Sequence, residues 1–256
     1  PMEQAIILYD IPGKSPSRKA WSPSTWKARQ VWPSRFALNV KQIPYRTEWV
    51  EYPDIIHVYE KYGLKNLYTA DDGSPLYTLP VIYDPSTEKA IPESTDIAKY
   101  LDKTYPDTLI LFPRGTLAFH AAFRTALGKA HNSMWYIVSC AVCDCLNERS
   151  QEYYRRTREA DEGKKLEEIR GEKEWEEAEA AWTKVSDWFD ANGEGHDDFV
   201  MGEGLCFADI GVASVLMWAK YTLPSEEWAR ICSWNNGKWK RIADSFVRYS
   251  QVDVDL

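Results

Sequence analysis

Residues 77–94 read YTLPVIYDPSTEKAIPES, and this stretch decides how the first part of the chain folds. Two short apolar runs lie on either side of residues 84–87, a cluster of residue types that favour turns. The arrangement predicts a β-hairpin whose first strand contains residues 81–83.

Pro80 stands at the mouth of that first strand and has no backbone N–H to donate to a neighbouring strand. A proline is tolerated at the first residue of a strand, at a sheet edge, or in a turn with a cis peptide bond. If the Leu79–Pro80 bond is cis, we expect the N–H and C=O of Leu79 to face outward. These groups could then bind an extended peptide as an added antiparallel strand.

A candidate anion site follows the hairpin. Ser94 is a candidate N-cap for a helix whose apolar positions fall within residues 97–101. The N-terminus of a helix attracts anions, and Glu93 could pair with an ammonium group. A ligand with a peptide unit and an α-carboxylate would therefore be held by Leu79 and Ser94, and glutathione fits this description.

Leu79-Pro80-Val81, followed by Glu93-Ser94, resembles the glutathione site of soluble glutathione transferases. The resemblance implies an α/β N-terminal thioredoxin-like domain and an all-α C-terminal domain. It also implies that glutathione is the cosubstrate and that Leu79, Pro80, Glu93 and Ser94 bind it. An unrelated hairpin followed by a capped helix is the alternative interpretation.

A second candidate site lies at Ser22-Pro23, where the serine fits an N-cap and the proline fits the first position of a helix. In glutathione transferases, the group at the start of the first helix faces the sulfur. A serine hydroxyl and the positive end of a helix both favour the thiolate. The resemblance therefore implies that Ser22 is catalytic, with Ser24 as the alternative. No cysteine precedes position 140, so we expect no mixed-disulfide chemistry in the first domain.

Residues 21–29, 35–39, 45–55 and 73–85 resemble a narrower group, the serine-type, etherase-related glutathione transferases of wood-decaying fungi, which are related to bacterial lignin β-etherases. This likeness implies hydrophobic aromatic electrophiles or aryl ethers as substrates. Residues 30–34 look like an insertion within the first helix of that group. Pro33 would cost roughly 3 kcal/mol inside a regular helix, so we expect the helix to end, kink or bulge near Trp32.

The composition around residues 107–115 indicates a linker between a first domain, 1–106, and a second domain, 116–256. The second domain shows helical patterns without strands. We place Trp135 and Tyr136, on its first helix, in the site for the aromatic substrate, and core packing is an equally good interpretation. A ligandin that binds aromatic small molecules with little catalysis is the alternative function.

The 256 residues carry a formal net charge of -8, which argues against nucleic acid and anionic membranes as partners. No apolar run approaches the roughly 20 residues that span a bilayer, and the beginning of the sequence does not resemble a signal peptide. These features predict a cytoplasmic protein. Cys140 and Cys143 lie in an apolar run without histidines at metal-binding spacing, so we expect no metal. Most members of the family are homodimers, and the resemblance implies the same here.

Overall fold

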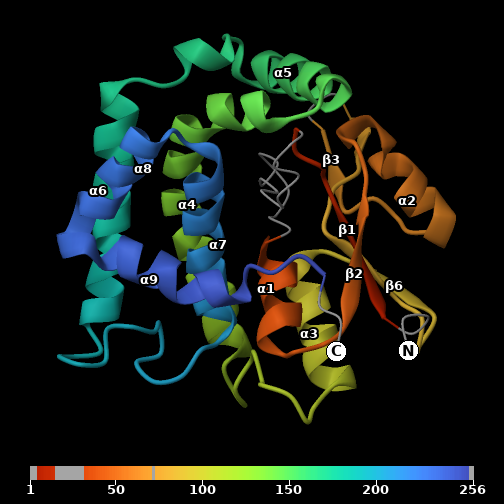
Figure 1. Cartoon of the computed structure of the whole chain (residues 1–256), viewed down its shortest axis with the longest axis horizontal. Coiled ribbons are helices and arrows are strands. Elements are labelled where there is room, and N and C mark those ends of the chain that lie inside the picture. Colours follow the sequence, from red (N-terminus) through yellow and green to blue (C-terminus); the bar gives the residue numbers. More distant parts are fainter. Residues whose placement is uncertain (1–4, 15–31, 71–72, 254–256) are drawn as a thin grey trace.

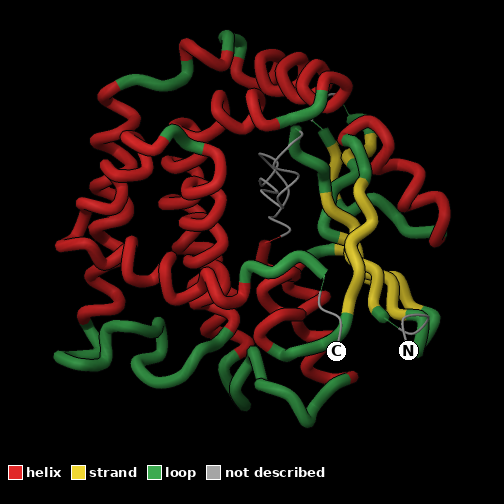
Figure 2. Tube along the Cα trace, in the orientation of Figure 1, coloured by secondary structure: helices red, strands yellow, loops and turns green. Residues whose placement is uncertain are grey.

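The computed structural model of the chain describes residues 5–14, 32–70 and 73–253. Within these ranges, strands and helices are interspersed up to residue 104, and helices dominate from residue 117 onward (Figure 1). Figure 2 separates the two parts by colour, with the yellow strands gathered in the first and red helices making up the second. The predicted thioredoxin-like first domain and all-helical second domain are both confirmed.

A four-stranded sheet with the order β2-β1-β5-β6 forms the centre of the first domain. The strands are β1 (Ile6–Asp10), β2 (Tyr45–Trp49), β5 (Val81–Asp84) and β6 (Lys89–Pro92). β1 runs parallel to β2 and antiparallel to β5, and the β5–β6 hairpin is the one that the sequence predicts. All five residues of β1 are buried, because this central strand has neighbours on both sides and helices over its faces.

The segment between β2 and β5 contains a second, two-stranded sheet. Its strands, β3 (Tyr68–Thr69) and β4 (Pro75–Leu76), contain two residues each. Strands this short carry no alternation that a sequence pattern could reveal.

Within the described residues, three α-helices accompany the first sheet. They are α1 (Trp32–Val40), α2 (Ile55–Tyr62), which follows a 3-10 turn at Tyr52–Asp54, and α3 (Ser94–Thr104). α2 ends at Gly63 in the left-handed region, with φ at 62°, as the glycine predicts.

α1 is described from Trp32 onward, and Pro33 is its second described residue. The predicted end, kink or bulge of the first helix near Trp32 borders on residues outside the described ranges and stays a prediction. The predicted helix start at Ser22 lies outside the described residues.

The second domain contains six α-helices within the described residues. They are α4 (Leu117–Cys145), α5 (Glu148–Glu162), α6 (Glu172–Asp190), α7 (Phe207–Thr222), α8 (Ser225–Ser233) and α9 (Lys238–Phe246). α5 ends at Gly163, which has a positive φ of 65°, and α6 begins after Gly171. α4 and α7 provide much of the core, where Trp135 and Trp218 are both completely or almost completely buried.

Polar contacts hold the predicted linker in place. Lys41 of α1 donates to the Asp102 carboxylate of α3 and to the Leu109 carbonyl, each over 2.8 Å. Asp102 also accepts the N–H groups of Leu111 and Phe112. These bonds hold the predicted linker, residues 107–115, against the first domain.

The C-terminal segment returns to the first domain and lies beside α1 (Figure 1). Asn39 of α1 donates to the carbonyls of Tyr249 and Gln251, and the Tyr45 hydroxyl donates to the Gln251 carbonyl over 2.8 Å. The end of the chain therefore stabilises the first domain. None of the helices within the described ranges combines the length and the apolar character required to cross a membrane.

Candidate functional site

The Leu79–Pro80 peptide bond is cis and lies directly before β5. The Tyr59 hydroxyl donates to the Thr78 carbonyl over 2.8 Å and holds the approach to this turn. The Pro80 carbonyl accepts the Glu93 N–H over 3.1 Å, which fixes the turn against the end of β6. Neither the N–H nor the C=O of Leu79 has a hydrogen-bond partner among the described residues. Both groups are thus available to an extended ligand.

Glu93, rather than Ser94, is the N-cap of α3. The Glu93 carboxylate accepts the Thr95 N–H over 3.1 Å and the Ser94 hydroxyl over 3.3 Å. Its backbone has a positive φ of 74°, which is uncommon for a residue other than glycine. Ser94 is instead the first residue of the helix, where its N–H has no intrahelical partner. The carboxylate and the helix N-terminus therefore lie side by side, one attracting cations and the other anions.

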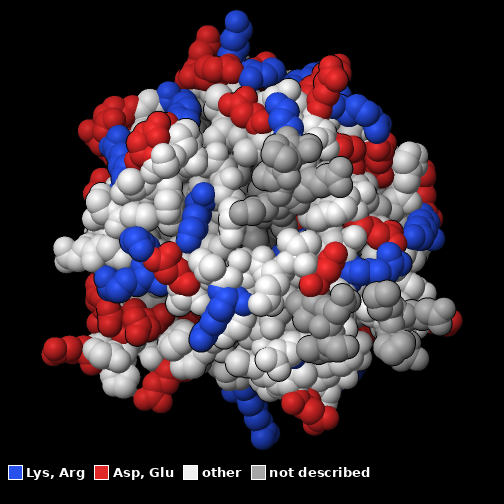
Figure 3. Space-filling model, viewed as in Figure 1, with Lys and Arg blue, Asp and Glu red and all other residues white. Residues whose placement is uncertain are grey.

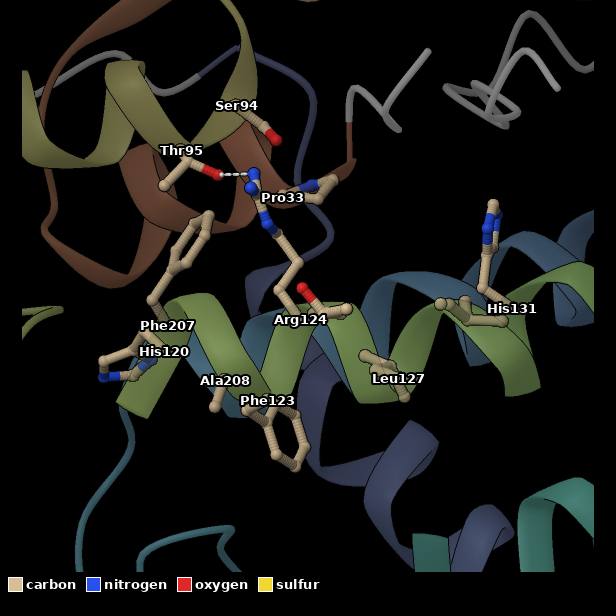
Figure 4. Close-up of a pocket in the computed structure, with 14 residues that line it drawn as sticks. Pro33, Ser94, Thr95, His120, Phe123, Arg124, Leu127, His131, Phe207 and Ala208 are labelled. Atoms are coloured by element: carbon tan, nitrogen blue, oxygen red, sulfur yellow. Dashed lines mark hydrogen bonds between the residues drawn. The ribbon is translucent and has the colours of Figure 1, made fainter. Parts of the chain in front are cut away.

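Arg124 reaches this point from α4 in the second domain, and sequence reasoning did not identify it. Its Nη1 donates to Thr95 Oγ1 over 2.8 Å and lies 3.8 Å from Glu93 Oε1 (Figure 4). A single arginine on a long helix gives no pattern that would single it out. Only the packing of α4 beside the start of α3 brings it to the site.

A cavity of about 300 Å³ extends from Ser94 and Pro33 along α4 and α7 (Figure 4). Much of its wall is apolar, and the larger apolar side chains that line it are Phe123, Leu127, Phe207 and Val215. His131 lines it as well, and burial lowers the pKa of His131 to about 4, so that the imidazole is neutral at pH 7. On the face shown in Figure 3, many of the coloured charged side chains lie toward the edge of the molecule.

Of the other residues predicted for the site, Trp135 and Tyr136 fall within the described ranges. Trp135 is 1% exposed and packs in the core, and Tyr136 is half-buried with its ring centroid 5.1 Å from that of Trp135. Neither is among the described residues that line the cavity. Ser22 and Ser24 lie outside the described residues.

No group of histidine, cysteine, aspartate or glutamate side chains in the described residues is arranged to hold a metal ion. Burial raises the pKa of the Cys143 thiol to about 11, so this group stays protonated near neutral pH.

Two family models match the chain. The model described as glutathione S-transferase, N-terminal domain, matches residues 21–104, and the model described as glutathione S-transferase, C-terminal domain, matches residues 118–249. Among characterised proteins, the glutathione S-transferase-like protein ustS of Aspergillus flavus is 30% identical over 270 residues, which cover 97% of this chain and 91% of that protein.

Two solved structures from other fungi are more similar still. Glutathione transferase GSTFuA3 from Phanerochaete chrysosporium is 43% identical, with a TM-score of 0.92 over 98% of this chain and 99% of its own. The glutathione S-transferase CsGST63524 of Ceriporiopsis subvermispora, solved in complex with glutathione, is 40% identical, with a TM-score of 0.89 over 98% of this chain and all of its own.

Proposed function

Because this chain belongs to the glutathione transferase family, we propose that it binds glutathione at the cis Leu79–Pro80 turn and the start of α3 and transfers it to aromatic electrophiles. The observation that supports this most directly is the juxtaposition of three groups in the first domain. They are the Glu93 carboxylate, the N–H of Ser94 and the main-chain groups of Leu79, which have no hydrogen-bond partner among the described residues. A relative with 40% identity was solved with glutathione bound.

Each of these three groups matches a functional group of glutathione. The cysteinyl peptide unit would pair with the N–H and C=O of Leu79 as an added strand. The γ-glutamyl ammonium would lie at Glu93, and the α-carboxylate of the same residue would lie at Ser94 and the N-terminus of α3. Pro80 supports this pairing by holding the turn against Glu93.

We propose that a serine hydroxyl, from Ser22 or alternatively Ser24, donates a hydrogen bond to the sulfur and favours its ionisation. The thiolate would attack an electrophilic carbon and form a C–S bond. With an aryl ether, the C–O bond breaks, the phenoxide leaves with the bonding electrons, and the proton lost by the thiol neutralises it. The products are a glutathione thioether and a phenol.

The cavity beside Ser94 supports an aromatic cosubstrate, because its walls include Phe123, Phe207 and Val215. Likeness to transferases of wood-decaying fungi favours aryl ethers or phenolics derived from wood. Three expectations stay predictions. The protein is expected to be a cytoplasmic homodimer, its domains are expected to divide at residues 107–115, and Trp135 and Tyr136 are expected to contribute to the aromatic site.

A calorimetric titration with glutathione tests the binding site, and turnover of a generic aryl halide and of an aryl ether tests the reaction. Ser22→Ala and Ser24→Ala are compared with the wild type, and Ser17→Ala, from the same region of the sequence, is the matched control. We expect micromolar to millimolar binding, with turnover lost in one of the two variants and kept in the control.

Two other results would change the assignment. Glutathione binding without turnover, together with tight binding of a fluorescent aromatic compound, would favour a ligandin. Absence of glutathione binding in the wild type would remove the site proposed at Leu79, Glu93 and Ser94.

A further inference from the structure

We propose that Arg124 of the second domain binds the α-carboxylate of the γ-glutamyl residue and thereby makes this carboxylate a requirement for tight binding. The inference rests on the glutathione site proposed above. It adds a residue from α4 to a site otherwise built from the first domain.

Arg124 is held in place by one of its donors and keeps the others available. Nη1 donates to Thr95 Oγ1 over 2.8 Å, which aims the guanidinium at the first turn of α3 (Figure 4). Neither Nη2 nor Nε of Arg124 has a hydrogen-bond partner among the described residues. A guanidinium has five N–H donors in a fixed plane, and this geometry suits a carboxylate.

Glu93 and Arg124 can each bind one of the two charged groups of the γ-glutamyl residue. Glu93 Oε1 lies 3.8 Å from Arg124 Nη1, so the two side chains form an ion pair without a direct hydrogen bond. A zwitterionic γ-glutamyl end fits this pair, with its ammonium on Glu93 and its carboxylate on Arg124. The N–H of Ser94, at the positive end of α3, would serve the same carboxylate.

The charge of the residues that line the cavity also favours binding of a carboxylate. Of the described residues that line it, Arg124 alone carries a permanent charge, although the chain as a whole has a net charge of -8. A cation in such a place selects anionic ligands. The ligand would also join α3 to α4, so that both domains contact the same amino-acid end of glutathione.

Solvent moderates the effect, because the Arg124 side chain is 40% exposed. We expect Arg124→Gln to weaken glutathione binding about 10-fold, as the loss of one charge-assisted contact does in a partly exposed site. Arg124→Lys keeps the charge but not the planar pair of donors, and we expect a smaller loss.

The test compares two ligands by calorimetry. One is glutathione, and the other is γ-aminobutyryl-cysteinyl-glycine, which lacks only the α-carboxylate. If Arg124 binds that carboxylate, Arg124→Gln weakens the binding of glutathione about 10-fold and leaves the binding of the analogue unchanged. Arg114→Gln, which removes an exposed arginine near the start of the same domain, is the control and leaves both affinities unchanged.

Two results would overturn the role of Arg124 while leaving the proposed function intact. The first is wild-type affinity for glutathione in Arg124→Gln. The second is an equal loss for both ligands, which would show that Arg124 acts only by supporting Thr95 and Glu93. If the wild type binds no glutathione at all, the proposed function itself fails, and this inference fails with it.

Discussion

The guanidinium of Arg35 and the carboxylate of Asp10 form an ion pair inside the first domain, with 2.7 Å between Nη2 and Oδ2 and side-chain exposures of only 1% and 0%. Arg35 also donates to the Tyr45 hydroxyl and to Thr47 Oγ1, both over 3.1 Å. The pair thus joins α1 to the carboxyl end of β1 and to β2. Since α1 also supplies Pro33 to the cavity wall, the ion pair helps to position that wall.

We expect Arg35→Met to reduce the free energy of unfolding by about 3–5 kcal/mol, because it leaves the Asp10 carboxylate buried without its charge partner. Asp10→Asn should cost a similar amount, and the double variant should lose less than the sum of the single losses. Urea denaturation measures all three. Arg149→Gln, which breaks an exposed pair with Asp54, is the control and should cost less than about 1 kcal/mol. Strictly additive losses in the double variant would show that the buried pair is not coupled.

Glu93→Gln tests the proposed ammonium site without removing the cap of α3. Glutamine keeps an oxygen for the Thr95 N–H but loses the negative charge, so we expect glutathione affinity to fall about 10-fold in calorimetry. Glu88→Gln is the matched control, because Glu88 also has a positive φ, 54°, but lies exposed in the hairpin turn. Equal glutathione affinities in the two variants would argue against an ammonium contact at Glu93.

Cys206 occupies the N-cap position of α7, where a serine is the stronger partner. Its thiol contacts the Asp209 carboxylate at 3.1 Å, and Asp209 accepts the Cys206 N–H over 2.8 Å. Burial, together with the charge of Asp209, raises the pKa of this thiol to about 12, so it is a neutral and weak donor.

We therefore expect Cys206→Ser to increase the free energy of unfolding by about 1 kcal/mol, since a hydroxyl forms stronger hydrogen bonds than a thiol in the capping box with Asp209. Thermal and urea unfolding of the variant measure the gain. Cys232→Ser on α8, which is not at a cap, should give no increase. A loss of stability in Cys206→Ser would mean that burial of the sulfur outweighs the better cap.

Local patterns explain why much of the fold could be predicted. The β5–β6 hairpin, the helix end at Gly63 and the helix breaks at Gly163 and Gly171 follow from residues that are close in sequence. The order of Leu79, Pro80, Glu93 and Ser94 was recognisable for the same reason, because all four lie within one hairpin and the helix that follows it.

Contacts between segments that are distant in the sequence could not be predicted from local patterns. Arg124 meets Thr95 across 29 residues, and nothing in the sequence near either residue indicates the contact. Trp135 and Phe123 both belong to the apolar pattern of α4, yet Trp135 packs in the core whereas Phe123 lines the cavity. Whether an apolar side chain of α4 packs in the core or lines the cavity depends on the positions of α6 and α7. The periodicity along α4 does not reveal those positions.

His120, at the start of α4, is buried with neither ring nitrogen bonded to another described residue. The rings of Phe112 and Phe119 lie against it, with centroids at 4.9 and 5.3 Å. Burial lowers the pKa of His120, and the charge of Asp102 opposes this effect only in part. The folded protein therefore favours the neutral imidazole.

The lowered pKa of His120 determines how the free energy of unfolding changes with pH. With a lowered pKa in the folded state, the unfolded state binds more protons as the pH falls below about 6.5, so His120 makes the protein less stable there. His120→Leu removes the unpaired polar ring, and we expect it to be about 1 kcal/mol more stable than the wild type at pH 5.5. The gain should shrink at pH 8. Urea unfolding at the two pH values, with His57→Leu on the exposed face of α2 as the control, measures the difference. A gain that is equal at both pH values would show that His120 does not titrate in this range.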